Sequence, residues 1–239
     1  MTRIVILATA VAFITACDTQ APQAEGMAAE ASGEWMELFN GENLDGWRGF
    51  QGEAPGAEWV VEDGALVLDV PEGTEERTAG DLITERQFEN FELELEWKVS
   101  EGGNSGIFFG VREIPGQAEA YETGIEMQVL DDERHPDGRN PATSAGACYD
   151  LYAPEGKQLR PAGEYNAVRL VVNDGHVEHW LNGRKIVEYQ IGSADWNERI
   201  ENSKFADWEH FARYRRGHIG LQDHTARVWF RNIRLREIP

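Results

Sequence analysis

The sequence predicts an all-β protein, a sandwich of two antiparallel sheets, for three reasons. Short segments rich in β-branched and aromatic residues recur along the chain, and Asp-Gly or Asn-Gly turns separate several of them. Residues 91–99 alternate strictly between apolar and charged side chains, as in a strand with one buried face. No regular alternation of strands with helices appears, so a parallel α/β fold is not expected.

The expected elements are short strands, interrupted near 193–212 by a helical or irregular excursion that carries several aromatic residues. The strand and hairpin predictions cover 59–70, 81–84, 91–99, 106–112, 122–132, 167–181, 185–189, 218–222 and 228–235. A polar turn-rich start near 38–47 precedes them.

Composition limits the classes of partner. The chain has 239 residues, and its 41% apolar content with eight Trp allows a sizeable core. Asp and Glu number 43 against 22 Lys and Arg, so nucleic acid is not an expected partner, because a polyanion needs a basic surface. The sequence contains no phosphate-binding loop, dinucleotide fingerprint or zinc motif.

The N-terminus has the pattern of an export signal. Residues 1–16 combine Arg3 with an apolar run too short to cross a bilayer, and the segment 14–17 resembles the bacterial lipoprotein signal-peptidase box. We therefore expect Cys17 to be lipidated, residues 17–34 to form a flexible tether, and 35–239 to form the folded domain. The protein is expected at a bacterial membrane, facing the periplasm; the sequence leaves inner and outer membrane open. Cys148 is expected to be a buried free thiol.

One predicted strand carries an unusual polar face. Glu126 and Gln128 alternate with Ile125, Met127 and Val129, so they share the face opposite the core. The strand runs into a loop at 131–137 that is dense in acid and base groups. This pattern is compatible with the floor and wall of a site, and equally with a solvated strand followed by an acidic loop.

Taken together in order, a series of short motifs resembles the bacterial 3-keto-disaccharide hydrolase family across about 200 residues. The matching blocks lie at 38–47, 80–84, 91–97, 103–107, 126–132, 135–136, 145–151, 161–164, 176–183, 217–224 and 228–233. The resemblance implies a concanavalin A-like jelly-roll fold and sugars oxidised to a ketone at C3 as substrates. Such a ketone acidifies the C2 proton, so the glycosidic oxygen can leave by elimination, and water can add back. This reaction needs a base near C2, an acid for the leaving oxygen and a donor for the ketone oxygen.

The predicted catalytic residues are Glu126, His135 and His224. Residues predicted to bind a small carbohydrate are Asn104, Phe108, Arg112, Gln128, Asp132, Tyr149, Trp180 and Gln222. For Glu126, an ion pair with Arg112 is the structural alternative. A divalent cation is possible near these groups, but their spacing in the sequence assigns no ligands.

Two other functions remain compatible with the sequence. A non-catalytic carbohydrate-binding module would use the same sandwich, with aromatic platforms and amides but no base beside a carboxylate. An ordinary glycosidase would need a second carboxylic acid at a suitable distance from Glu126, and that distance cannot be read from the sequence.

Overall fold

A computed structural model describes residues 33–52, 54–70 and 80–239, all within one compact unit, Ala31–Pro239. The predicted signal peptide, Cys17 and most of the predicted tether lie outside the described residues. No helix in the described ranges is long and apolar enough to cross a membrane.

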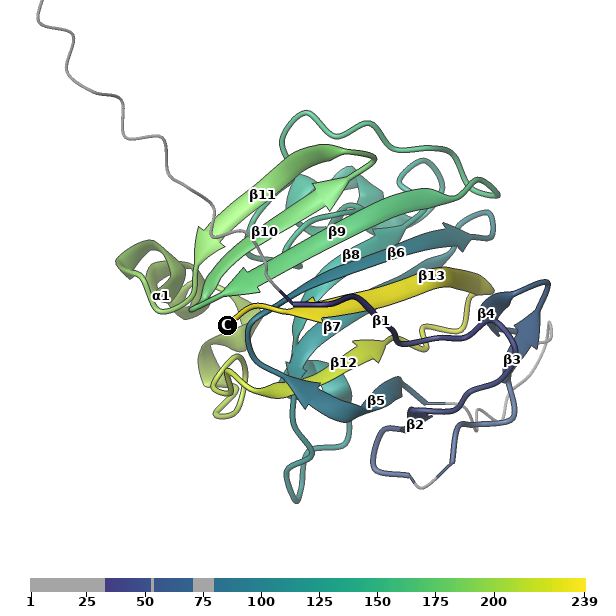
Figure 1. The fold of residues 1–239 in the computed structure, drawn as a ribbon. Coiled ribbons are helices and arrows are strands. Elements are labelled where there is room, and N and C mark those ends of the chain that lie inside the picture. Colours follow the sequence, from purple (N-terminus) through teal and green to yellow (C-terminus); the bar gives the residue numbers. More distant parts are fainter. Residues whose placement is uncertain (1–32, 53, 71–79) are drawn as a thin grey trace, which may run out of the picture. The chain divides into compact units, whose positions relative to one another are not determined.

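The predicted two-sheet sandwich is confirmed (Figure 1). The larger sheet has the order β11-β10-β9-β6-β13-β4-β3, with β1 paired to β13. Its strands are β1 (Met36–Glu37), β3 (Trp59–Glu62), β4 (Ala65–Leu68), β6 (Phe91–Val99), β9 (Asn166–Asn173), β10 (His176–Leu181), β11 (Arg184–Gln190) and β13 (Val228–Glu237).

The smaller sheet has the order β2-β5-β12-β7-β8, and every neighbouring pair is antiparallel. Its strands are β2 (Trp47–Gly49), β5 (Leu82–Phe88), β7 (Asn104–Val111), β8 (Ile125–Leu130) and β12 (Gly217–Leu221). The helical elements are short: α1 (Ala194–Glu201) and the 3₁₀ turns η1 (Ala120–Glu122), η2 (Pro136–Arg139), η3 (Pro141–Thr143) and η4 (Lys204–Asp207). The predicted excursion near 193–212 thus contains α1 and η4.

Turn chemistry explains the hairpins of the larger sheet. Asp63-Gly64, Asp174-Gly175 and Asn182-Gly183 each have two successive residues at positive φ. That conformation matches the twist of the flanking strands and favours Asp or Asn followed by Gly. These three turns join β3 to β4, β9 to β10 and β10 to β11, as the sequence predicted.

Alternation fixes which face of each sheet is buried. On β6, the five predicted inward residues are at most 2% exposed: Phe91, Leu93, Leu95, Trp97 and Val99. On the smaller sheet, Ile125, Met127 and Val129 of β8 join the same core. Packing between the two sheets therefore uses one face of each. The opposite face of the smaller sheet holds Glu126 and Gln128, and on it lies the pocket described next.

Candidate active site

A pocket of about 320 Å³ lies over the outer face of the smaller sheet. This volume is in the range of small-molecule sites, about 300–1,000 Å³. Strands β7 and β8 and the end of β12 supply the floor, and the segment 204–211 supplies a wall. The lining residues are Asn104, Tyr121, Gly124, Glu126, Gln128, Cys148, Tyr149, Lys204, Phe205, Trp208, Phe211, Gln222 and His224.

Gly106 forms the centre of the floor. It pairs with Gln128 on one side, and on the other its carbonyl accepts the backbone N–H of Gln222 at 2.9 Å. A Cβ at position 106 would meet the Glu126 carboxylate, so the absence of a side chain leaves the space that this carboxylate occupies. Glu126 therefore leans along the sheet toward Asn104, which lies two residues before Gly106 on β7.

Glu126 is the carboxylic acid of this floor. Burial raises its pKa to about 8, and the negative charges of Asp81 and Asp137 act in the same direction, whereas the positive charge of Lys204 opposes the shift. Within the described residues, no donor forms a hydrogen bond with its carboxylate and no cation lies within ion-pair distance. A partly exposed carboxyl with a pKa near working pH suits proton transfer.

Two amide oxygens of the pocket also lack partners. Oδ1 of Asn104 and Oε1 of Gln222 are buried and accept no hydrogen bond from any described residue. A buried acceptor without a donor costs about 1–3 kcal/mol, so such groups are good positions for ligand hydroxyls. Both residues were predicted to bind substrate, and the structure brings both to the pocket.

The two predicted catalytic histidines are neighbours, and of the two His224 lines the pocket. The His135 and His224 rings are 6.3 Å apart, edge to face, and His135 Nε2 lies 3.5 Å from the Asn104 amide nitrogen. Nδ1 of His135 accepts the backbone N–H of Asp137 at 3.2 Å. With Nδ1 as an acceptor, a neutral His135 carries its proton on Nε2, which therefore cannot accept a hydrogen bond from the Asn104 amide nitrogen.

Tyr149 lines the pocket beside η2. Its hydroxyl donates to Asp137 at 3.4 Å, and its backbone N–H donates to the Glu126 carbonyl. Burial, followed by the negative charge of Asp137, raises the pKa of Tyr149 well above its usual value, so the phenol stays protonated. It can therefore donate a proton in hydrogen bonds but does not serve as a base at neutral pH.

Aromatic residues form the other end of the pocket. Tyr121 and Trp208 are 5.7 Å apart, and Phe205 stacks on Phe211 at 3.8 Å. The backbone N–H of Ala212 donates to Thr123, which fixes this segment beside the start of β8. The sequence prediction placed Phe205, Trp208 and Phe211 in a helical or irregular excursion and assigned them no role. Their repetition at positions 205, 208 and 211 was the available signal.

Asp81 connects the segment that carries His224 to the segment that carries Tyr121. Its carboxylate accepts the backbone N–H of Asp223 at 2.9 Å and that of Ala120 at 3.3 Å. These amides adjoin His224 and Tyr121, which line the pocket. Burial raises the pKa of Asp81 to about 7, so its charge and its two hydrogen bonds depend on pH near neutrality.

Some predicted binding residues have other roles. Phe108 is completely buried against Ile83 and Val111, so no ring face is free for a sugar. Gly110, at positive φ, interrupts the alternation of β7. Arg112 consequently lies over the Tyr214 ring and forms no ion pair with Glu126.

Gln128 and Asp132 are held by the protein itself. The Gln128 amide donates to the Thr143 carbonyl, and its oxygen accepts the Val129 N–H, although the residue lines the pocket. Asp132 forms an ion pair with Lys157 at 2.6 Å and accepts the Ala145 N–H. Both residues therefore support the loops around the floor. Cys148 is a buried free thiol, as predicted.

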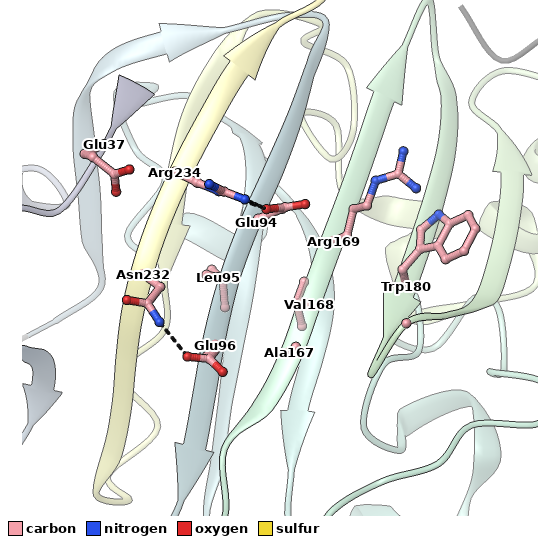
Figure 2. A pocket seen from close by; sticks show the side chains of 11 residues that line it. Glu37, Glu94, Leu95, Glu96, Ala167, Val168, Arg169, Trp180, Asn232 and Arg234 are labelled. Carbon is pink, nitrogen blue, oxygen red and sulfur yellow. Dashed lines mark hydrogen bonds and ion pairs between the residues drawn. The ribbon is translucent and has the colours of Figure 1, made fainter. Parts of the chain in front are cut away.

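Trp180, predicted as a sugar platform, lies instead in a groove on the outer face of the larger sheet (Figure 2). This groove is larger, about 530 Å³, but several of its polar groups pair with one another. Figure 2 shows Arg234 meeting Glu94 across neighbouring strands and Asn232 meeting Glu96. The Trp180 indole donates to Glu178, and Arg169 lies over its ring.

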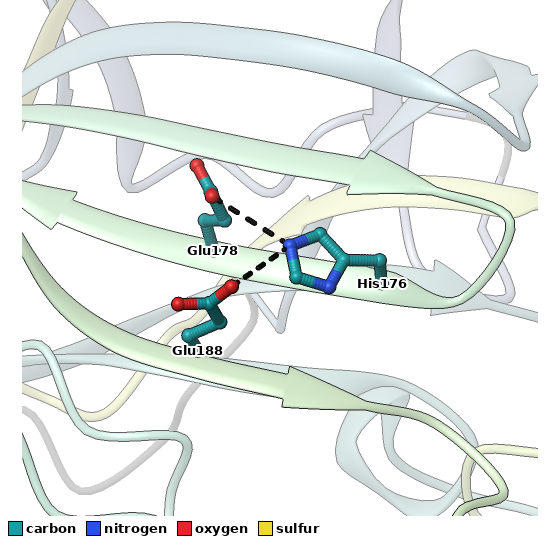
Figure 3. A group of neighbouring side chains, drawn as sticks. All are labelled: His176, Glu178 and Glu188. Carbon is teal, nitrogen blue, oxygen red and sulfur yellow. Dashed lines mark ion pairs between the residues drawn. The ribbon is translucent and has the colours of Figure 1, made fainter. Parts of the chain in front are cut away.

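On that same sheet, three side chains have the spacing of metal ligands. His176, Glu178 and Glu188 each place one ligand atom within 4.8 Å of the others (Figure 3). The Lys185 ammonium lies 3.1 Å from Glu178 and 2.6 Å from Glu188. The two carboxylates thus already neutralise a cation of the chain. A divalent cation near Glu126 and His135 stays a prediction.

Comparison with known proteins agrees with this arrangement. Residues 34–236 match the family described as the 3-keto-alpha-glucoside-1,2-lyase-like domain. A 3-keto-disaccharide hydrolase from Bacteroides thetaiotaomicron is 33% identical over 225 residues, covering 84% of this chain and 78% of that protein.

Solved structures give the same result. The crystal structure of a proposed glycosyl hydrolase from Parabacteroides distasonis is 33% identical with a TM-score of 0.78, and the match covers 88% of this chain and 96% of the other. A second from the same organism is 26% identical with a TM-score of 0.60, covering 85% and 84%. The chain therefore belongs to the family of 3-keto-alpha-glucoside-1,2-lyase-like domains.

Proposed function

We propose that this protein is a carbohydrate-active enzyme that cleaves the glycosidic bond of 3-keto-glycosides, including 3-keto-disaccharides. Family membership and the name of the Bacteroides relative support the substrate class. The observation that carries the proposal is the Glu126 carboxyl above Gly106, in a pocket that also presents two unpaired amide oxygens and His224, whose ring lies beside that of His135.

The proposed first step is removal of the C2 proton by the Glu126 carboxylate. The electron pair of the C2–H bond forms an enolate whose charge lies on the C3 oxygen. The Glu126 carboxylate is a stronger base than that of an ordinary glutamate because the pKa of Glu126 is raised to about 8. The unpaired oxygens of Asn104 and Gln222 accept hydroxyl protons of the sugar and hold the ring over the floor.

In the second step the C3 carbonyl re-forms, a C1–C2 double bond forms and the C1–O bond breaks. The leaving oxygen needs a proton, and we assign its delivery to the protonated form of His135, whose Nε2 lies beside Asn104. Water then adds across the double bond, with OH joining C1 and H joining C2, to give net hydrolysis. No second carboxylate is required to stabilise an oxocarbenium ion.

The test is release of reducing sugar from a 3-keto-disaccharide. Glu126→Gln should lower kcat/KM by about 10²- to 10⁴-fold, the usual contribution of a general base. Glu94→Gln is the matched control on the outer face of the larger sheet and should retain activity. Binding of an unoxidised glycan without any cleavage of the keto-sugar would instead favour a carbohydrate-binding module.

The pH profile identifies the direction of proton transfer. A base must be ionised, so kcat/KM of the wild-type enzyme should rise with pH and level off above about 8. A profile that falls through pH 8 would instead assign Glu126 the role of general acid for the leaving oxygen.

We also propose that the enzyme is exported and held at a bacterial membrane, facing the periplasm, by an acylated Cys17. The support is the N-terminal sequence pattern alone. Expression with a labelled fatty acid should mark the wild-type protein in the membrane fraction. Cys17→Ser should remove the label and release the protein from the membrane; labelling that persists in this variant would refute the anchor.

A further inference from the structure

Lys204 is the cation of the pocket, and unlike Lys157 and Lys185 it has no carboxylate partner among the described residues. Lys157 forms an ion pair with Asp132, Lys185 pairs with two glutamates, and Lys98 lies over Trp229 on the larger sheet. Lys204 has no carboxylate within ion-pair distance among the described residues, although it lines the same pocket as Glu126.

Aromatic rings hold the Lys204 ammonium. It lies 4.3 Å from the centre of the Tyr149 ring, 5.2 Å from that of Phe205 and 5.8 Å from that of Trp208. The negative faces of such rings attract a cation and favour the protonated amine. These three rings therefore keep a positive charge at the pocket, and no carboxylate neutralises it.

The backbone at Lys204 is fixed. Lys204 opens η4, and the Ser203 hydroxyl caps this turn by accepting the backbone N–H of Phe205. The Phe205 side chain is 4% exposed and stacks on Phe211. Lys204 itself is exposed and lines the pocket, so its flexible side chain can move the ammonium a short distance to meet a ligand oxygen.

We infer that Lys204 donates a hydrogen bond and positive charge to the C3 oxygen of the keto-sugar as that oxygen becomes an enolate. This role rests on the proposed function. In the first step the C2–H electron pair moves onto that oxygen while the proton moves to Glu126. A cation aimed at the developing negative charge lowers the barrier without taking a proton or forming a covalent bond.

Exchange of the C2 proton separates this role from cleavage. In D₂O, NMR follows the loss of the C2–H signal of a 3-keto-glycoside while an assay follows sugar release. Lys204→Met should slow both exchange and kcat by about 10²-fold, in the range seen when one such donor is removed, with KM changed only a few-fold. Lys204→Arg keeps the charge and should recover part of the rate, and Lys98→Met is the control that should behave as wild type.

The outcomes distinguish the two proposals. Unchanged exchange in Lys204→Met, or a loss confined to KM, would overturn the role of Lys204 and leave the proposed function standing. A wild-type enzyme that neither exchanges the C2 proton nor releases sugar would overturn the proposed function itself. Reduction of the enzyme–substrate mixture with borohydride should add no mass to the protein; a stable adduct at Lys204 would replace the electrostatic role with a covalent imine.

Discussion

The outer faces of the two sheets differ in how their charged side chains are paired. On the larger sheet, the acidic row of β6 meets arginines directly across β13: Arg236 with Glu92, Arg234 with Glu94 and Arg231 with Glu96. At the pocket over the smaller sheet, Glu126 and Lys204 have no such partners among the described residues, and Asn104 and Gln222 each have a buried unpaired oxygen. In the larger groove, charged groups thus pair with other groups of the protein. The smaller pocket instead leaves groups unpaired that a ligand can contact.

This difference shows that cavity size is a poor guide to function here. The groove with Trp180 has the greater volume, about 530 Å³ against 320 Å³. Surface ion pairs contribute little to stability, about 0–1 kcal/mol each. A side chain that is held in such a pair is nevertheless not available to contact a substrate. A carboxyl kept unpaired in a partly dry pocket costs stability and gains reactivity.

The largest expected effect comes from the floor. Gly106→Ala would place a methyl group against the Glu126 carboxylate, which must move, while the backbone at 106 tolerates alanine. We expect kcat/KM to fall by about 10²-fold, the cost of a small misplacement of a reacting group. Gly52→Ala is the matched control, because no atom lies within 3.5 Å of a Cβ there. Equal activity in the two variants would refute the positioning role of Gly106.

Next in size is the stability cost of Glu126. Its folded pKa of about 8, against the ordinary 4.5, means that the folded state holds a proton that the unfolded state loses between those values. Stability contributed by this group therefore falls as pH rises through that window. Glu126→Gln should stabilise the protein above pH 8 by on the order of 2 kcal/mol, allowing for partial exposure, and hardly at all below pH 4.5.

Urea unfolding at pH 8.5 and at pH 4.5 measures this difference. Glu94→Gln on the larger sheet should show the opposite sign at pH 8.5, because it breaks an ion pair with Arg234. If both variants lose stability at pH 8.5, the two carboxylates have similar environments and the contrast between the faces fails.

A pair of tryptophans tests the same contrast in binding. Trp208→Ala removes part of the aromatic wall and should raise KM about tenfold, equivalent to about 1.4 kcal/mol. Trp180→Ala, in the larger groove, should leave KM unchanged. Steady-state kinetics on one 3-keto-disaccharide checks both; a larger KM effect at Trp180 would move the binding site to the other sheet.

The smallest effect is expected in the charge row. A double-mutant cycle on Glu94 and Arg234, measured by urea unfolding, should give a coupling of about 0.2–1 kcal/mol because both side chains are partly exposed. A coupling of several kcal/mol would mean that this row stabilises the fold rather than serving as a solvated face.

The strand pattern of the fold was predictable because alternation and turn chemistry are local properties. Phe91–Val99 and the Asp63-Gly64 hairpin needed no information from distant residues. Which strands neighbour each other was not predictable from such signals. Phe108 shows the consequence, since its side chain was expected at the site but is buried by contacts with Ile83.

The candidate site was predictable in part for the same reason. Strand phase put Glu126 and Gln128 on one face, but the carbonyl that accepts from the Gln128 amide belongs to Thr143, 15 residues away. Lys204 carries no motif and lies 78 positions after Glu126, so its place in the pocket depends on tertiary packing alone. The Gly110 break in alternation likewise moved Arg112 away from its expected role.

The positions of β12 and β13 in the two sheets mean that the candidate site can assemble only after these strands have paired. Each of these last two strands lies inside its sheet, β12 between β5 and β7 and β13 between β6 and β4. Gln222 and His224 follow β12 directly, so the pocket is incomplete until residues from opposite ends of the domain have paired. Such long-range closure makes folding slow. During synthesis, the earlier strands must wait for β12, and a polypeptide truncated before Gly217 lacks Gln222 and His224 of the candidate site.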